Sequence, residues 1–125
     1  MLAILRTVNA GVNQLPYKAD IPGFDDWSPI DESGGDCDSY AVAKLRRLYA
    51  AGIPIESLRL ACCYVETGEY HAVLIADLPE GAYMLDNRQP FPVPIKDVVS
   101  LLGYKPDRIQ KVGGQREWVE WVGAV

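Results

Sequence analysis

The chain has 125 residues, of which 49% are hydrophobic, and this is typical of a single soluble globular domain with its own core. Its formal net charge of -5 argues against a nucleic-acid partner, because such a partner normally needs a basic face. The apolar stretch over residues 1–8 is too short for a secretory signal or a membrane span. We therefore expect one domain over residues 1–125, a monomer without nucleic-acid or membrane partners.

Cysteine usage indicates the compartment. The chain has three cysteines, Cys37, Cys62 and Cys63, and the last two are adjacent. They form neither a disulfide framework nor the C-x-x-C spacing of a zinc site, which favours a reducing compartment. A cytoplasmic location is expected, with the periplasm as the alternative if an export signal has been removed.

The first half of the chain is predicted to be helical. Apolar residues at helical spacing over residues 1–15 predict an amphipathic helix. Proline and glycine over residues 17–32 predict a long loop, in which Trp27 covers either the core or a binding cleft. A second helix is predicted to begin at Cys37 and to end at Gly52.

The second half is predicted to be rich in strands. Short turns separate three apolar segments, which predict an antiparallel meander over residues 58–65, 70–76 and 82–86. The middle strand is apolar almost throughout and is expected to be covered on both faces. Three prolines between residues 90 and 94 exclude regular structure there. A short helix over residues 95–102 and one or two strands over residues 108–122 complete the prediction.

Cys37 lies in the first turn of the central helix, with Asp36 as the predicted N-cap. Unpaired N–H groups and the positive end of the helix dipole favour a thiolate at this position. The alternative is a small buried cysteine without reactivity. Because Asp36 and Asp38 would raise the thiol pKa, something must offset them. A bound cation, Arg59 or another basic side chain, or an imidazolium at His71 would do so.

The only histidine, His71, opens the middle strand. Pairing around the turn at 77–81 opposes residues whose numbers add to about 157 or 158, so His71 faces Asp86 or Asn87. An aspartate there would fix the imidazole tautomer, and Asp86 is therefore preferred over Asn87. The same reasoning places the central helix across the face of the sheet that carries His71.

Cys37, His71 and Asp86 together form a nucleophile, base and orienting group. Each also has a purely structural interpretation, since a strand histidine can be a core residue and an aspartate at a strand end often forms a turn. The combination favours catalysis. The backbone N–H of Cys37 would contribute to an oxyanion hole, with Trp27 or a neighbour as the second donor.

Over residues 8–93 the chain resembles the bacterial transglutaminase-like cysteine peptidases. The resemblance is carried by four ordered motifs: Gly35-Asp36-Cys37-Asp38, Gly52-Ile53-Pro54, His71-Ala72-Val73-Leu74 and Leu85-Asp86-Asn87. It implies an α+β fold with a papain/transglutaminase-like core, in which an N-terminal helix and a nucleophile-bearing central helix pack on an antiparallel sheet. It also implies a Cys37-His71-Asp86 triad that cleaves a protein or peptide substrate through a thioester acyl-enzyme.

The best-known branch of that family is a periplasmic, calcium-requiring protease of bacterial surface adhesins. The resemblance therefore implies Asp36 and Asp38 as metal ligands, but Ser39 stands where that branch usually has an acid. We expect no required cofactor and weak or absent calcium binding. A compact chain without a signal would fit a phage or prophage gene. Two other functions stay open: acyl transfer to an amine by the same triad, and a non-catalytic binding or assembly module on this scaffold.

Overall fold

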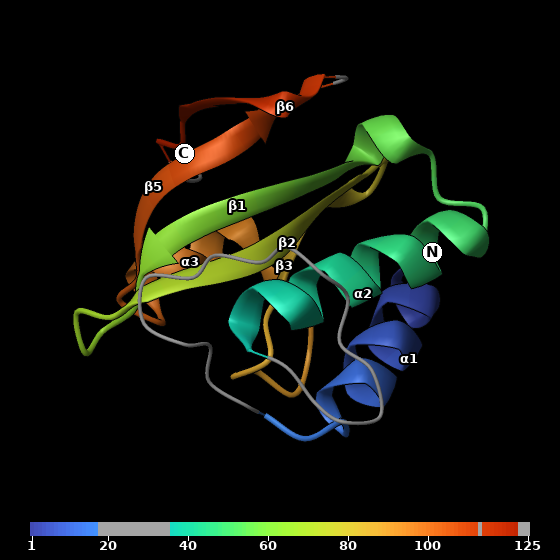
Figure 1. The fold of residues 1–125 in the computed structure, drawn as a ribbon, viewed down its shortest axis with the longest axis horizontal. Helices are drawn as coiled ribbons and strands as arrows, with labels where there is room; N and C mark the ends of the chain where they lie inside the picture. The colour runs from blue at the N-terminus through green and yellow to red at the C-terminus, as the bar shows by residue number, and fades with distance from the viewer. Residues whose placement is uncertain (18–35, 113, 123–125) are drawn as a thin grey trace.

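The computed structural model describes residues 1–17, 36–112 and 114–122, without the side chains of residues 114–116. Within them, three α-helices and a six-stranded antiparallel sheet form the fold, with helices on both faces of the sheet (Figure 1). The predicted α+β class is confirmed. None of these helices has the length and apolar character needed to cross a membrane.

The two long helices pack against each other and against one face of the sheet (Figure 1). The first, α1, is Leu2–Asn13 and the second, α2, is Cys37–Ala50. Gly52 follows α2 with φ of 102°, a conformation that glycine adopts without steric cost, and it ends the helix as predicted. A short 3-10 helix, η1 (Ile55–Ser57), then leads into the sheet.

The sheet has the order β4-β3-β2-β1-β5-β6. Its elements, with the third helix, are β1 (Leu58–Tyr64), β2 (Tyr70–Leu78), β3 (Gly81–Leu85), β4 (Val93–Pro94), α3 (Ile95–Ser100), β5 (Lys105–Lys111) and β6 (Gly114–Glu120). The predicted meander of β1, β2 and β3 is confirmed. The prediction that prolines exclude any strand was wrong for β4. Proline has no N–H group to donate, and the outermost strand of a sheet tolerates this because one of its sides has no neighbouring strand.

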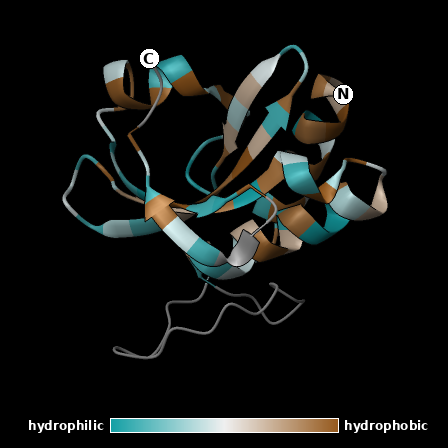
Figure 2. Cartoon of the chain, turned by 90° about the horizontal axis from the view of Figure 1, so that it is seen from above, coloured by the Kyte–Doolittle hydropathy of each residue, from teal (hydrophilic) through white to brown (hydrophobic). Residues whose placement is uncertain are grey.

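Each face of the sheet carries its own apolar cluster. On the α1/α2 face, Leu74 and Ala76 of β2 pack with Leu48 of α2. On the α3 face, Val73 and Ile75 of β2 pack with residues of α3 and of the segment after it. Because strand side chains alternate, β2 is buried on both faces, as its continuous apolar character predicts. Figure 2 shows the hydrophobic residues concentrated along the strands and on the helices that cover them.

The register between β2 and β3 differs from the prediction. Leu74 pairs with Leu85 and Leu78 pairs with Gly81, so paired residue numbers add to 159. The reason is that β2 continues to Leu78 and leaves only two residues for the turn. This sum differs by two from the predicted register that opposes His71 and Asp86. Because side chains alternate with a period of two, a shift of two residues keeps Asp86 on the face of His71. Asp86 is therefore diagonal to His71 rather than directly opposite.

The position of α2 also corrects a prediction. His71 has the same parity along β2 as Val73 and Ile75, which face α3. Helix α2 instead covers the face of Leu74, so it does not lie across the face that carries His71. The two layers meet near the start of β2, where Cys37, the first residue of α2, accepts the backbone N–H of Ala72.

Candidate active site

Cys37 is the first residue of α2 and is half-buried. The preceding Asp36 caps the helix as predicted, since its Oδ1 accepts hydrogen bonds from the backbone N and the Oγ of Ser39, at 3.3 and 3.1 Å. The backbone N–H of Ala72 donates to Cys37 Sγ at 3.5 Å. A sulfur that accepts N–H groups at a helix N-terminus is in a suitable place to carry negative charge.

His71 is buried and joins both Cys37 and Asp86. Its Nε2 donates to Asp86 Oδ1 at 2.5 Å, which leaves Nδ1 to face the thiol. Burial by itself would lower the pKa of the imidazole, but hydrogen bonds and charge interactions with Asp86 and Cys37 outweigh it and raise the pKa to about 9. The imidazolium form is therefore favoured at neutral pH.

Asp86 follows directly after β3 and its side chain is almost completely buried. Besides His71, it accepts the backbone N–H of Arg88 at 3.0 Å on Oδ1 and the hydroxyl of Tyr104 at 2.7 Å on Oδ2. Burial acts to raise the pKa of this carboxyl, but hydrogen bonds and the charge of His71 prevail and lower it. Asp86 is thus held as an ionised acceptor. Asn87, the alternative partner that the hairpin pairing left open, lies instead in the wall of the neighbouring pocket.

Tyr104 is a site residue that the sequence analysis missed. It is buried after α3 on the second face of the sheet, and its ring meets that of His71 edge-on at 6.4 Å between centroids. Its hydroxyl donates to Asp86 and accepts from Arg88 Nη1 at 3.0 Å. The sequence places Tyr104 between Gly103 and a strand, where nothing in the local pattern signals a contact with a distant carboxylate.

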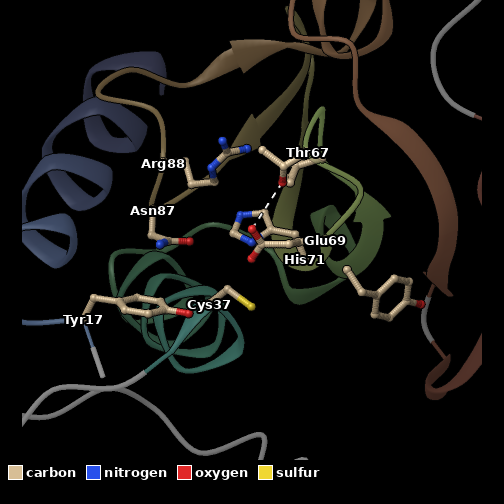
Figure 3. Close-up of a pocket in the computed structure, with 9 residues that line it drawn as sticks. Tyr17, Cys37, Thr67, Glu69, His71, Asn87 and Arg88 are labelled. Carbon is tan, nitrogen blue, oxygen red and sulfur yellow. Dashed lines mark hydrogen bonds between the residues drawn. The ribbon is translucent and has the colours of Figure 1, made fainter. Parts of the chain in front are cut away.

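A cavity of about 330 Å³ opens beside the thiol and the imidazole (Figure 3). Nine residues line it: Tyr17, Cys37, Val65, Thr67, Glu69, Tyr70, His71, Asn87 and Arg88. Figure 3 shows Cys37 and His71 close together, with Tyr17 to one side of the thiol. The reactive atoms are therefore accessible from this cavity, whereas Cys62 and Cys63 are buried.

Arg59 and Arg88 both pair with other acidic residues, and of the two it is Arg88 that lines the cavity beside the thiol. Arg59, one of the groups proposed to offset the acids around the thiol, pairs with Asp77 at 3.0 Å. Arg88 forms an ion pair with Glu66 and its guanidinium lies 5.6 Å from the ring centroid of Tyr104. Of the two described groups named for that role, Arg59 and His71, it is His71 that interacts directly with Cys37.

The remaining predicted site residues are only partly described. Trp27 lies outside the described residues. Asp36 and Asp38 are both buried at the start of α2. No cluster of three or more histidine, cysteine or acidic side chains suited to a metal ion occurs in residues 1–17, 36–112 and 114–122.

Comparison with known proteins places the chain in a family. The sequence model of the bacterial transglutaminase-like cysteine proteinases matches residues 1–121. The chain belongs to this family. Within it, the chain is similar to solved structures of LapG from Legionella pneumophila. No significant match was found among curated proteins.

The similarity to LapG covers most of this family member. The calcium-bound LapG structure aligns with a TM-score of 0.74 and 27% identity over 87% of this chain and 64% of the LapG chain. The EGTA-treated structure aligns with a TM-score of 0.69 and 27% identity over 86% and 61% of the two chains. The chain thus spans less than two thirds of the length of the LapG chains. The expected family and fold are confirmed.

Proposed function

We propose that this family member is a cysteine peptidase that hydrolyses amide bonds of a protein or peptide, with Cys37 as nucleophile, His71 as acid and base, and Asp86 as orienting group. One observation carries the proposal. A continuous set of contacts runs from the thiol through the imidazole to a buried carboxylate, beside a cavity that opens on the thiol. Family membership supports the same chemistry.

The contacts support a definite order of proton transfers. Asp86 holds Nε2–H, so Nδ1 exchanges a proton with Sγ. The thiolate attacks the substrate carbonyl, and the resulting oxyanion accepts the backbone N–H of Cys37. His71 then donates its proton to the leaving amine, and the thioester acyl-enzyme forms. Water activated by His71 hydrolyses the thioester and restores the thiol.

The second oxyanion donor and the metal are further parts of the proposal. Trp27 or a neighbour is proposed as the second donor. LapG has been solved in a calcium-bound form. The described residues of this chain do not by themselves fit such a site, because Asp36 Oδ1 is engaged by Ser39 and no cluster of three ligands is present among them. For this reason we assign calcium no step in the reaction. Asp36 and Asp38 are the residues that we propose to test for calcium binding.

Alkylation followed by peptide mapping tests the nucleophile. Limiting iodoacetamide should modify Cys37 well before Cys62 or Cys63, since only Cys37 combines exposure with a helix N-terminus and an adjacent imidazole. Burial raises the pKa of the Cys63 thiol to about 12, which also disfavours its reaction. Earlier labelling of Cys62 or Cys63 in the folded protein would contradict the assignment.

Product analysis tests the reaction. Incubation with a denatured protein mixture should create new peptide N-termini that mass spectrometry detects, and the Cys37→Ser variant should create none. Adding a primary amine distinguishes hydrolysis from acyl transfer, because transfer would attach the amine to the acyl product. Amine-linked products in place of free carboxylates would favour the transferase. If neither product forms and iodoacetamide does not prefer Cys37, the result would contradict the enzyme and favour a non-catalytic binding or assembly module.

A further inference from the structure

Lys44 is a charged residue that the proposed reaction does not use. It lies two turns after Cys37 on α2, and none of its surface is exposed. Burying an ammonium group is unfavourable unless it is well paired, and an apolar side chain would fill the same space without that cost. The pKa of Lys44 is accordingly lowered to about 7 by burial, partly opposed by attraction to Asp86.

The ammonium group connects α2 to α1. Lys44 Nζ donates to Asn9 Oδ1 at 2.8 Å, and Asn9 is itself fully buried. An ammonium group has donors only, so it fixes the orientation of the Asn9 amide with the oxygen toward Lys44. The amide nitrogen of Asn9 is then directed to the carbonyl of Gln89, to which it donates at 3.1 Å.

The Gln89 carbonyl belongs to the turn that carries Asp86. Within this turn the Gln89 N–H donates to the Asp86 carbonyl at 3.2 Å. A second amide of α1, that of Asn13, donates to both of these carbonyls at 3.1 Å. Contacts therefore run from the helix that carries Cys37, through α1, to the turn that carries Asp86.

We propose that Lys44 is a positioning residue for the site: its donors fix the amide of Asn9, which holds the turn that sets Asp86 against His71. The inference depends on the proposed function, because it gives Asp86 its orienting role. It explains why a charged residue occupies a fully buried position between two helices. An arrangement that served packing alone would need neither the donors of Lys44 nor the amide of Asn9.

His71 is the only histidine, so one set of imidazole NMR signals reports its pKa without assignment ambiguity. We would compare the wild type with Lys44→Met, which removes the donors, and with Lys44→Gln, which removes the charge but keeps a donor. Lys96→Met is the matched control, because Lys96 is exposed on α3. In Lys44→Met, the His71 pKa should fall from about 9 toward 6.5, since Asp86 is less well placed. Lys44→Gln should lie between Lys44→Met and the wild type.

Kinetics on a cleaved peptide should agree with the NMR result. We expect kcat to fall by about tenfold or more in Lys44→Met with little change in KM, because misplacement of an orienting group slows the chemical step. An unchanged His71 pKa in a destabilised Lys44→Met variant would overturn the proposal. A raised pKa would too, because it would report only the lost positive charge. Failure of both Lys44 variants to fold would assign Lys44 to stability and also overturn it.

The two proposals can fail separately. If the wild type cleaves no peptide but Lys44→Met lowers the His71 pKa, the proposed function fails while the positioning role stands. If the wild type cleaves peptides and Lys44→Met matches it in both measurements, the positioning role fails alone.

Discussion

The two faces of the sheet contribute different parts of the candidate site. The α1/α2 face supplies Cys37 at the start of a helix that packs on Leu74 and its neighbours. The α3 face supplies His71, whose ring meets that of Tyr104, a member of the separate apolar cluster on this face. Because the proposed nucleophile, Cys37, and the proposed base, His71, come from different layers, a change in either layer can affect the candidate site in its own way. We therefore expect that stability and reactivity can be altered separately in this chain.

Asp86→Ala is expected to have the largest effect on the α3 face. Without the carboxylate, His71 loses its orienting partner, and kcat should fall by about 100-fold or more. The His71 pKa should fall from about 9 toward 6.5. The raised pKa stabilises the folded wild type below about pH 6.5, and this contribution is lost as pH rises through about 9. Chemical denaturation at several pH values should show that loss in the wild type and not in Asp86→Ala.

Asn87→Ala is the matched control for that experiment. Asn87 lines the cavity rather than contacting His71, so the His71 pKa should stay near 9. An Asp86→Ala variant with full activity would contradict the orienting role, and so would an equal loss of activity in both variants.

Core truncation compares the two faces directly. Leu48→Ala on the α1/α2 face and Met84→Ala on the α3 face should each lower the free energy of unfolding by about 2–5 kcal/mol, because both side chains are fully buried. Met84 is on β3, two residues from Asp86, so only its truncation should lower the His71 pKa. Urea denaturation and histidine NMR check this. If Leu48→Ala moved the His71 pKa as much, apolar packing on the α1/α2 face, and not only the polar contacts of Lys44 and Asn9, would also control the position of Asp86.

Tyr104→Phe should have a smaller effect than loss of Asp86. It removes the hydroxyl that donates to Asp86 Oδ2 and leaves the ring beside His71. A buried carboxylate that loses one hydrogen bond should become about 1–3 kcal/mol less favourable in the folded state. We expect a lower melting temperature, a modestly lower kcat and an unchanged rate of Cys37 alkylation. A kcat equal to that of the wild type would show that Tyr104 contributes only to folding.

Calcium should have the smallest effect. Asp36 is engaged as a helix cap on the α1/α2 layer, so we expect little change in melting temperature when calcium is added. Magnesium serves as the control for ionic strength and for charge screening. A clear rise with calcium alone would show that further oxygen ligands complete a site with Asp36 and Asp38.

Local patterns predicted the parts of the site that depend on local structure. The cap at Asp36 and the helix that begins at Cys37 follow from glycine, acid and apolar spacing. The pairing of His71 with Asp86 followed from a hairpin for which two registers were predicted. The observed register differs by two residues from the one that opposes His71 and Asp86, and a difference of two conserves the face.

Contacts between layers could not be predicted in this way. No pattern in the sequence indicates that α2 lies on the opposite face from His71, because apolar periodicity does not say which face of a sheet a helix covers. Lys44 occupies a polar position in a helical pattern, where an exposed side chain is the usual outcome. Tyr104 follows a glycine after a short helix, and only the folded chain brings it to Asp86.

The proline strand β4 has a consequence for self-association. At this edge the outermost strand is Val93–Pro94, and proline has no N–H group to donate. Another chain therefore cannot add to this edge as a strand with a full ladder of hydrogen bonds. The opposite edge is β6, Gly114–Glu120, which is seven residues long. Aggregation or dimerisation by strand addition would therefore proceed from β6, and a proline introduced there would block it.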